Sequence, residues 1–225
     1  FTGGVISGNT ASGSWGGGDI YCVSSNVDIE DCVIKGNSAT DREGVGGAIN
    51  FDGGFATQII KNCLFTDNFA GDKGGAVVCQ WWAEPDILDC TFSANSAIAA
   101  GGAIFTDWSS LPVITDSIFN GCGHHAIHEE DDGGDALLTY CLFNHNYGGD
   151  YYDSQDQAVY TGAVQINSNV NGASHNIDGD PLFATGSLGW FYLSQIDAGQ
   201  SSNSPALDAG SDTAANLGLS GYTTR

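Results

Sequence analysis

The sequence predicts an all-β fold, a parallel β-helix, because short β-type segments recur through most of it. They return every 24–31 residues, and glycine or asparagine bounds each one. The 33 glycines, in a chain with 41% hydrophobic residues, exclude both a helical bundle and a disordered acidic tail. Three strands of three to five residues per coil would stack in parallel at about 4.8 Å around one narrow core. Equivalent residues of successive coils should therefore lie above one another.

The first repeated unit is a short apolar segment followed by asparagine. Its copies, 31, 27, 27 and 24 residues apart, are Cys32–Ile34, Cys63–Phe65, Cys90–Phe92, Ser117–Phe119 and Cys141–Phe143. The predicted asparagine ladder, five residues after the start of a copy, is Asn37, Asn68, Asn95 and Asn146, with Cys122 as the exception. Asn9 belongs to the same ladder, because it lies five residues after the start of an earlier copy, Gly4–Ile6. Stacked asparagines can hydrogen-bond the backbone and the asparagine of the next coil. The phenylalanines should form an internal aromatic stack.

The second repeated unit is Gly-Gly-Ala-Ile or a close variant. It occurs at residues 17–20, 46–49, 74–77 and 101–104, and a degenerate fifth copy begins with His124 and His125. A glycine pair can form a tight corner with positive φ, where a side chain would collide with the next coil. These corners should alternate with the strands along the whole solenoid.

Four of the seven cysteines occupy one ladder position, and Ser117 occupies the same position in the remaining coil. These cysteines are Cys32, Cys63, Cys90 and Cys141. A disulfide partner would not be replaced by serine, whereas a small buried thiol can be. We therefore expect buried free thiols, with at least one disulfide between coils as the alternative.

The repeat weakens towards the C-terminus and divides the chain into two parts. Residues 1–160 should form the repeated coils, and residues 161–225 should form degenerate terminal coils and a C-terminal cap of the same domain. Ala163–Ile166 is predicted as one more strand of the stack. The first coil begins abruptly at Phe1, so we expect further coils before it.

The formal net charge of −22, with only five lysines and arginines, restricts the partners. Nucleic acid is excluded because phosphate binding needs a basic stripe, and an anionic membrane surface is disfavoured. No apolar stretch approaches the length of a membrane-spanning helix, so no membrane span is expected in this chain.

The order of the motifs resembles a known family. Gly-Gly-Ala-Ile units alternating with Phe-x-x-Asn, at Phe65–Asn68, Phe92–Asn95 and Phe143–Asn146, resemble the polymorphic outer-membrane-protein repeats of bacteria. The segments Asp180–Phe183, Tyr192–Gln195 and Ser204–Gly210 look like the C-terminal portion of secreted bacterial right-handed β-helix proteins. The resemblance implies a right-handed parallel β-helix exported to the cell surface or matrix, with adhesion or scaffolding as its role. It implies no catalytic residues.

A row of polar residues, one per coil, follows the Gly-Gly-Ala-Ile units. The row is Asp52, Gln80, Asp107 and Glu130, and the ligand-binding candidates Trp81, Trp82, Glu84 and Trp108 accompany it. Tryptophan faces suit sugar rings and protein partners, which makes this a predicted binding surface together with Asp52. Asp107 and Glu130, about 5 Å apart on adjacent coils, would match the carboxylate pair of a retaining glycosidase and are the catalytic candidates. Over either role taken alone, we favour a chance row with its aromatics packed under a loop.

Two groups of side chains could bind cations. Carboxylates suited to calcium occur in two loops, at Asp150, Asp153, Asp156, Asp178 and Asp180. His124, His125 and His128 precede a run of acids at residues 129–135 and could hold a divalent cation. We favour a solvated acidic loop for this second group, because a strand sends alternate residues to opposite faces and scatters the ligands.

Together these patterns predict an extracellular or bacterial cell-surface β-helix with a structural or adhesive role. Its partners would be glycans or extracellular protein neighbours, with no essential cofactor and calcium as an optional ion. One alternative is a carbohydrate-active enzyme, a hydrolase rather than a lyase because the few basic residues form no cleft for a uronate. The other is a calcium-dependent filament subunit that associates end to end.

Overall fold

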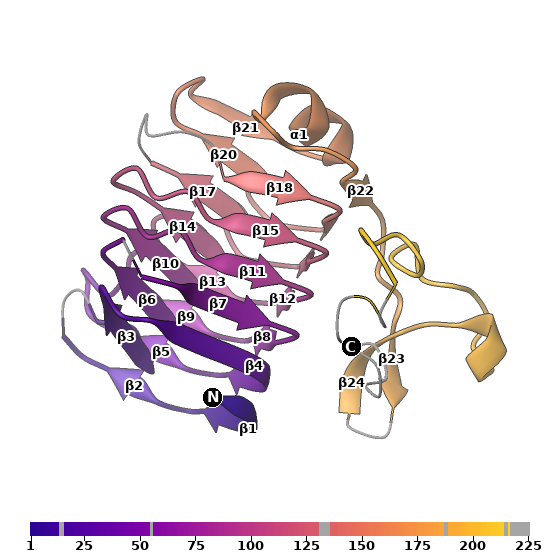
Figure 1. Ribbon diagram of the computed structural model, residues 1–225, viewed down its shortest axis with the longest axis horizontal. Helices are drawn as coiled ribbons and strands as arrows, with labels where there is room; N and C mark the ends of the chain where they lie inside the picture. The colour runs from indigo at the N-terminus through magenta and orange to yellow at the C-terminus, as the bar shows by residue number, and fades with distance from the viewer. Residues whose placement is uncertain (14–15, 55, 131–135, 187–188, 214–215, 217–225) are drawn as a thin grey trace.

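The chain winds as a stack of parallel coils with most strands between two and four residues long. The computed structural model describes residues 1–13, 16–54, 56–130, 136–186, 189–213 and 216. A complete coil contains four strands, as in β6 (Ile49–Asp52), β7 (Gln58–Lys61), β8 (Leu64–Thr66) and β9 (Phe69–Ala70). Figure 1 shows these coils lying one above another from β1 to β20. The predicted parallel β-helix is confirmed.

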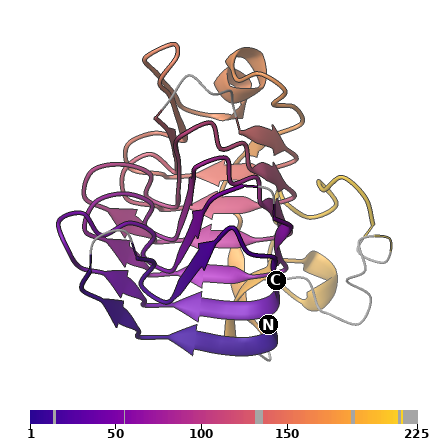
Figure 2. The ribbon, with the colours of Figure 1, turned by 60° about the vertical axis from the view of Figure 1, so that its left-hand side comes forward.

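Equivalent strands of successive coils pair into three sheets (Figure 2). The seven-stranded sheet contains β3 (Ile20–Val23), β6, β10 (Val77–Gln80), β14 (Ile104–Thr106), β17 (Ile127–Glu129), β20 (Tyr151–Asp153) and β21 (Ala158–Tyr160). The four-stranded sheet contains β2 (Thr10–Ala11), β5 (Ser38–Ala39), β9 and β13 (Ser96–Ala97). This last sheet was not predicted, because a two-residue strand shows no alternation of apolar and polar residues.

The eleven-stranded sheet has two flanks joined by the long strand β4 (Val27–Lys35), with β1 (Thr2–Ser7) paired to β4. The first flank contains β7, β11 (Asp86–Leu88), β15 (Val113–Thr115) and β18 (Leu137–Thr139). The second flank contains β8, β12 (Thr91–Ser93), β16 (Ile118–Asn120), β19 (Leu142–Asn144) and β22 (Ile177–Asp178). The sheets enclose a single long core.

Identical side chains fill equivalent core positions, as the repeat predicts. Phe65, Phe92, Phe119 and Phe143 are buried, with ring centroids 4.8, 5.0 and 5.3 Å apart and nearly parallel planes. This spacing is close to the distance between neighbouring strands of a sheet. The rings therefore pack face to face because the backbone register places them there.

The asparagine ladder is confirmed. Asn68 shows the pattern: its Oδ1 accepts hydrogen bonds from the backbone N–H and the Nδ2 of Asn37, at 3.0 and 3.2 Å. Its Nδ2 donates to the Ile34 carbonyl at 3.0 Å and to Asn95 Oδ1 at 2.9 Å. Cys122 replaces asparagine in one coil, and its thiol lies 3.7 Å from the Phe92 carbonyl. The amides satisfy backbone groups that the corner leaves without a sheet partner.

All seven cysteines are free thiols and buried, as we favoured. The thiols of Cys63 and Cys90 lie 3.2 and 3.1 Å from the carbonyl oxygens two residues earlier, on Lys61 and Leu88. Ser117 donates its hydroxyl to the corresponding Thr115 carbonyl at 3.0 Å. Serine fits this position because thiol and hydroxyl act as the same donor there.

Left-handed backbone turns sit at several corners. The residue before each ladder cysteine has a positive φ, and so do its counterparts: Asp31, Asn62, Asp89, Asp116, Tyr140 and His175, with φ from 49° to 59°. Aspartate and asparagine tolerate this conformation better than other side chains. Left-handed corners were predicted only at glycines, so this row of corners was not predicted.

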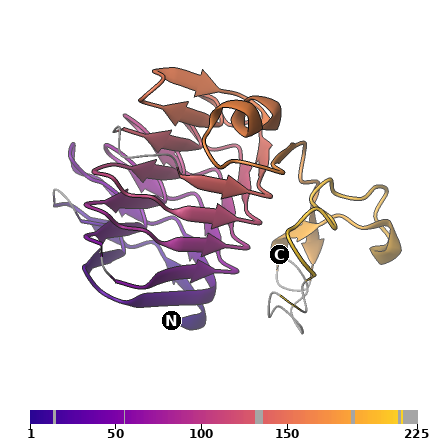
Figure 3. The same cartoon turned by 45° about the horizontal axis from the view of Figure 1, so that its top comes forward.

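The last coil is closed by a different kind of structure. Strand β21 turns back antiparallel to β20, and helix α1 (Ala163–Asn169) lies over the end of the stack (Figure 3). The prediction of a strand at Ala163–Ile166 was wrong: Ala163, Ile166 and Val170 are buried at helical spacing, so a helix buries this segment better. The predicted end-to-end association would meet this cap rather than a bare parallel coil.

The C-terminal segment does not continue the coils. Strands β23 (Phe183–Gly186) and β24 (Gly189–Leu193) form an antiparallel pair of their own, and a 3-10 helix covers Ile196–Ala198. Residues 179–186 and 189–213, called the tail below, lie beside the eleven-stranded sheet (Figures 1 and 3). The expected degenerate coils therefore end near β22, and the tail packs on the side of the stack.

Candidate functional site

Two clusters of side chains lie next to the seven-stranded sheet, one where its strands end and one where a strand begins. The tryptophan cluster is Trp81, Trp82 and Trp108, in the corners that follow β10 and β14. The histidine cluster is His124, His125 and His128, in the corner before β17 and on β17 itself. Both depart from the repeat, because other coils carry different residue types at these positions.

The tryptophan cluster is half-exposed. Trp81 and Trp108, on adjacent coils, stack with ring centroids 4.4 Å apart and an interplanar angle of 5°, and Trp82 lies 6.0 Å from Trp81. The exposed fractions of Trp81, Trp82 and Trp108 are 38%, 52% and 49%. The expectation of aromatics packed under a loop is therefore not met, and the rings are accessible to a partner.

All three tryptophans have left-handed backbone conformations, with φ of 58°, 62° and 52°. Bulky residues rarely occupy this region, and each costs on the order of 1–2 kcal/mol there. The equivalent corner of the preceding coil uses Gly53, whose φ is 100°. The fold alone would favour glycine or another small residue at these positions.

The polar residues predicted beside the tryptophans differ in exposure and in hydrogen bonding. Glu84 is exposed and, with Trp82, Asn26 and Thr57, lines a shallow depression. Asp52 accepts a hydrogen bond from the Tyr21 hydroxyl at 2.5 Å, and this bond, followed by burial, raises the pKa of Tyr21 to about 12. Gln80 is buried, so the predicted surface row is interrupted.

The two catalytic candidates are held by other groups. Asp107 Oδ1 accepts the backbone N–H of Trp108 at 2.8 Å, and Glu130 lies 2.9 Å from His128 Nε2 and 4.0 Å from Lys73 Nζ. The two residues do lie on adjacent coils, because Thr106 pairs with Glu129. Catalysis by this pair stays a prediction.

The histidine cluster is tighter than the sequence analysis favoured. One ring nitrogen from each histidine lies within 4.8 Å of those of the other two. His124 and His125 belong to a corner, not a strand, so strand alternation does not separate them from His128. The corner folds over the outer face of the sheet, from which His128 projects. The acids Asp131, Asp132 and Asp135 lie outside the described residues.

The surroundings keep the imidazoles neutral at pH 7. Burial, followed by the neighbouring histidines, lowers the pKa of His125 to about 4. Burial also lowers the pKa of His128 to about 4, helped by His124 and Lys73. The ring of Tyr152 stacks on His128 at 4.3 Å and on His125 at 5.2 Å. The ring of Tyr152 therefore covers His125 and His128 from the side of the next coil.

The calcium candidates are divided among several turns. Asp150 and Asp178 meet at the start of α1, where they accept the N–H groups of Gly162 and Ala163, both at 2.7 Å. Asp153 and Asp180 accept backbone N–H groups of their own turns, and Asp156 accepts the Tyr160 hydroxyl. Asp150 and Asp178 therefore lie together, whereas each of the other three aspartates accepts hydrogen bonds in its own turn. Calcium binding stays a prediction.

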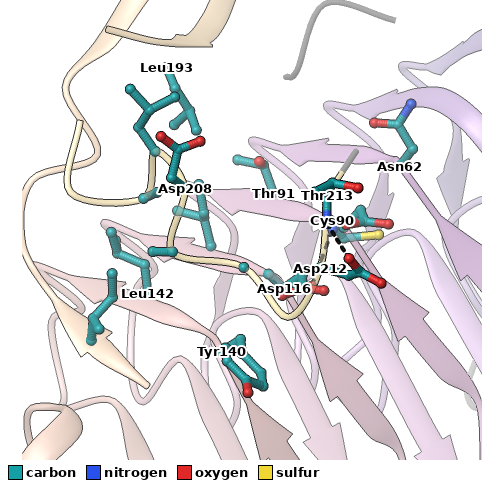
Figure 4. Close-up of a pocket in the computed structure, with 18 residues that line it drawn as sticks. Asn62, Cys90, Thr91, Asp116, Tyr140, Leu142, Leu193, Asp208, Asp212 and Thr213 are labelled. Carbon is teal, nitrogen blue, oxygen red and sulfur yellow. Dashed lines mark hydrogen bonds between the residues drawn. The ribbon is translucent and has the colours of Figure 1, made fainter. Parts of the chain in front are cut away.

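A cavity of about 280 Å³ separates the tail from the eleven-stranded sheet (Figure 4). Asp89, Asp116 and Tyr140 line it from the left-handed corners, and Leu193 and Asp208 line it from the tail. Ser211 donates its backbone N–H and its hydroxyl to Asp116 at 2.7 and 2.5 Å. Burial, followed by the charge of Asp116, raises the pKa of Asp89 to about 6. The cavity marks where the tail attaches to the stack.

Residues 62–80 and 89–107 match the Chlamydia polymorphic membrane protein repeat. These ranges contain the cysteine, phenylalanine and asparagine ladder positions of two coils and end immediately before Trp81 and Trp108. No curated protein and no solved structure matches the chain.

The repeat family implies a bacterial outer-membrane or surface location. Among the described residues, no helix is long and apolar enough to span a membrane. The stacked coils and the two matched repeats agree with each other, since each repeat covers the β8 or β12 side of one coil and ends after β10 or β14. The chain is thus a parallel β-helix with repeats similar to those of the polymorphic membrane proteins of Chlamydia.

Proposed function

We propose that the protein is an adhesin-like surface module whose tryptophan cluster binds neutral glycans. The observation that carries the proposal is the exposed Trp81–Trp108 stack in strained corners. Backbone strain that the fold does not need tends to mark functional positions. The cluster contributes little to the core, which the phenylalanine stack fills without it.

The chemistry of the cluster suits a sugar. Flat aromatic faces present a large, rigid apolar surface that loses little conformational entropy on binding. The carboxylate of Glu84 lies beside Trp82 at the edge of the shallow depression and offers hydrogen-bond acceptors for sugar hydroxyls. A protein with a net charge of −22 repels sialylated or sulfated glycans, so the acidic surroundings favour neutral ones.

A glycan array with neutral, sialylated and sulfated oligosaccharides tests the proposal. We expect the wild-type protein to bind neutral glycans selectively, without releasing any product. Trp81→Ala and Trp108→Ala should each weaken binding by about 10- to 30-fold, because aromatic contacts at the centre of an interface dominate affinity. Glu84→Gln should weaken it less.

Tyr147→Ala is the matched control, because Tyr147 is an aromatic residue with a 92% exposed side chain outside the cluster. Its binding should equal that of the wild type. Unchanged binding by Trp81→Ala and Trp108→Ala would contradict the proposal. Binding of extracellular-matrix proteins in place of glycans would assign the surface to a protein partner instead.

A further inference from the structure

The histidine cluster combines features that a structural corner does not need. His125 Nδ1 and His128 Nδ1 lie 3.1 Å apart, and one nitrogen of His124 lies within 4.8 Å of the ligand nitrogens of both. His124 Nδ1 is buried and makes no hydrogen bond within the described part of the chain. A buried polar atom without a partner is costly, so a ligand at this position would remove the cost.

Both corner histidines occupy positions where glycine is the better structural choice. His124 has φ 71°, matching Gly46, Gly74 and Gly101 at 65°, 66° and 63° in the other coils. His125 stands in the position of the second glycine of each pair. Two neighbouring departures from the repeat thus supply two imidazoles to one cluster.

The third histidine is oriented by a carboxylate. His128 Nε2 lies 2.9 Å from Glu130 Oε2, which favours the tautomer with the proton on Nε2. The lone pair of His128 Nδ1 then faces His125 Nδ1. A carboxylate that fixes the far nitrogen of a ligand histidine is the usual arrangement around protein-bound zinc.

We propose that His124, His125 and His128 bind a zinc ion through their ring nitrogens, with Glu130 orienting His128 from outside. Zinc bonds to imidazole nitrogen are about 2.0–2.1 Å long, which gives about 3.4 Å between nitrogens of a tetrahedral site. The 3.1 Å contact between His125 and His128 is already close to this value. Rotation of the partly exposed His124 ring would bring in the third nitrogen.

The ligand set selects the class of metal. Three neutral imidazoles suit zinc and other borderline transition metals, whereas calcium and magnesium prefer oxygen ligands. The fourth position would be taken by water or another donor, as in zinc sites with three protein ligands. This inference is independent of the glycan proposal, because the two clusters share no residue.

Zinc titration of the metal-free, full-length protein against a chromophoric chelator tests the inference. We expect one equivalent of zinc to bind with a micromolar or lower dissociation constant. His124→Gly, His125→Gly and His128→Phe should each weaken binding at least 10-fold. These substitutions copy residues of other coils, since Phe105 is the register partner of His128, so the folded stack should persist.

His145→Ala is the matched control, because His145 is exposed and its counterpart Ala94 has the same left-handed conformation. It should bind zinc like the wild type. Cobalt added in place of zinc should give the visible absorption bands of a tetrahedral site, and these bands should be lost in the three cluster variants. Binding that persists in all three variants, or no stoichiometric binding by the wild type, would overturn the inference. Urea unfolding of each variant separates a lost site from a lost fold.

Discussion

The phenylalanine stack inside the solenoid and the Trp81–Trp108 pair on its surface have nearly the same ring geometry but different physical causes. Phe92 and its neighbours are fully buried, and their 4.8–5.3 Å spacing follows from the coil register. Trp81 and Trp108 stack at 4.4 Å in left-handed corners with about half of each side chain in solvent. The interior stack follows from the coil register that forms the fold. The surface stack, in contrast, requires two tryptophans to adopt a left-handed backbone conformation that bulky residues rarely occupy. The comparison shows that stacking of like residues on adjacent coils does not by itself indicate that the stack stabilises the fold.

The largest expected effect is on the interior stack. Phe92→Ala removes a ring from between two others and leaves a cavity, so it should lower the free energy of unfolding by about 3–5 kcal/mol. Equilibrium unfolding in urea measures this loss. Phe92→Leu, which keeps most of the volume, should cost clearly less, and equal losses for both variants would mean that the stack is not tightly packed.

The asparagine ladder should show the next largest effect. Asn68→Ala leaves the Ile34 carbonyl and the Asn37 N–H without their side-chain partners. Two unsatisfied buried groups should cost about 2–4 kcal/mol. Asn68→Cys copies Cys122 and should retain part of this stability in the same urea experiment. Wild-type stability in Asn68→Ala would show that these hydrogen bonds contribute little.

The cysteine ladder should tolerate substitution. Cys90→Ser copies Ser117, which donates to the same carbonyl position, so its unfolding free energy should fall by less than about 1 kcal/mol. Burial raises the pKa of Cys122 and Cys141 to about 12, so these two native thiols should resist alkylation at pH 8. Mass spectrometry after iodoacetamide treatment checks this, with urea-unfolded protein as the control. Rapid labelling of the native protein would mean that the core is open.

The smallest effect concerns the left-handed corner at Asp89. Its pKa is raised from 3.8 to about 6, so the folded protein holds the proton more tightly than the unfolded chain does. The stabilisation is complete below pH 4 and is lost as the pH rises through 6. Asp89→Asn copies Asn62 and should therefore stabilise the protein at pH 7 by less than about 1 kcal/mol, because partial exposure screens the charge. The two proteins should differ less at pH 4, and stabilisation that is greatest at pH 4 would reverse the expected sign.

The ladders could be predicted because spacing in the sequence becomes stacking in space once strands are parallel. The recurrence of asparagine five residues after each ladder cysteine was enough to place Asn37, Asn68 and Asn95 above one another. The free thiols followed from Ser117, since a position that accepts serine needs no disulfide partner. These inferences depend on repetition, which a single sequence displays.

Features that occur once could not be predicted in the same way. Helix α1 is a short segment with two buried residues, Ala163 and Ile166, too few to exceed the β signal around it. The histidine cluster was underestimated because strand alternation was applied to residues of a corner. The strain of the tryptophan corners is a property of the backbone angles, and the presence of tryptophan in the sequence does not reveal those angles.

The most direct test of the contrast between the two stacks is the unfolding free energy of the double variant Trp81→Ala, Trp108→Ala. An exposed aromatic pair contributes about 0.5–1.5 kcal/mol beyond its burial, and alanine, which keeps the Cβ, leaves the left-handed backbone cost unchanged. We therefore predict a value within about 1 kcal/mol of the wild type, together with the loss of glycan binding. A loss of about 3–5 kcal/mol, as expected for Phe92→Ala, would show that the surface pair belongs to the fold and would contradict the account.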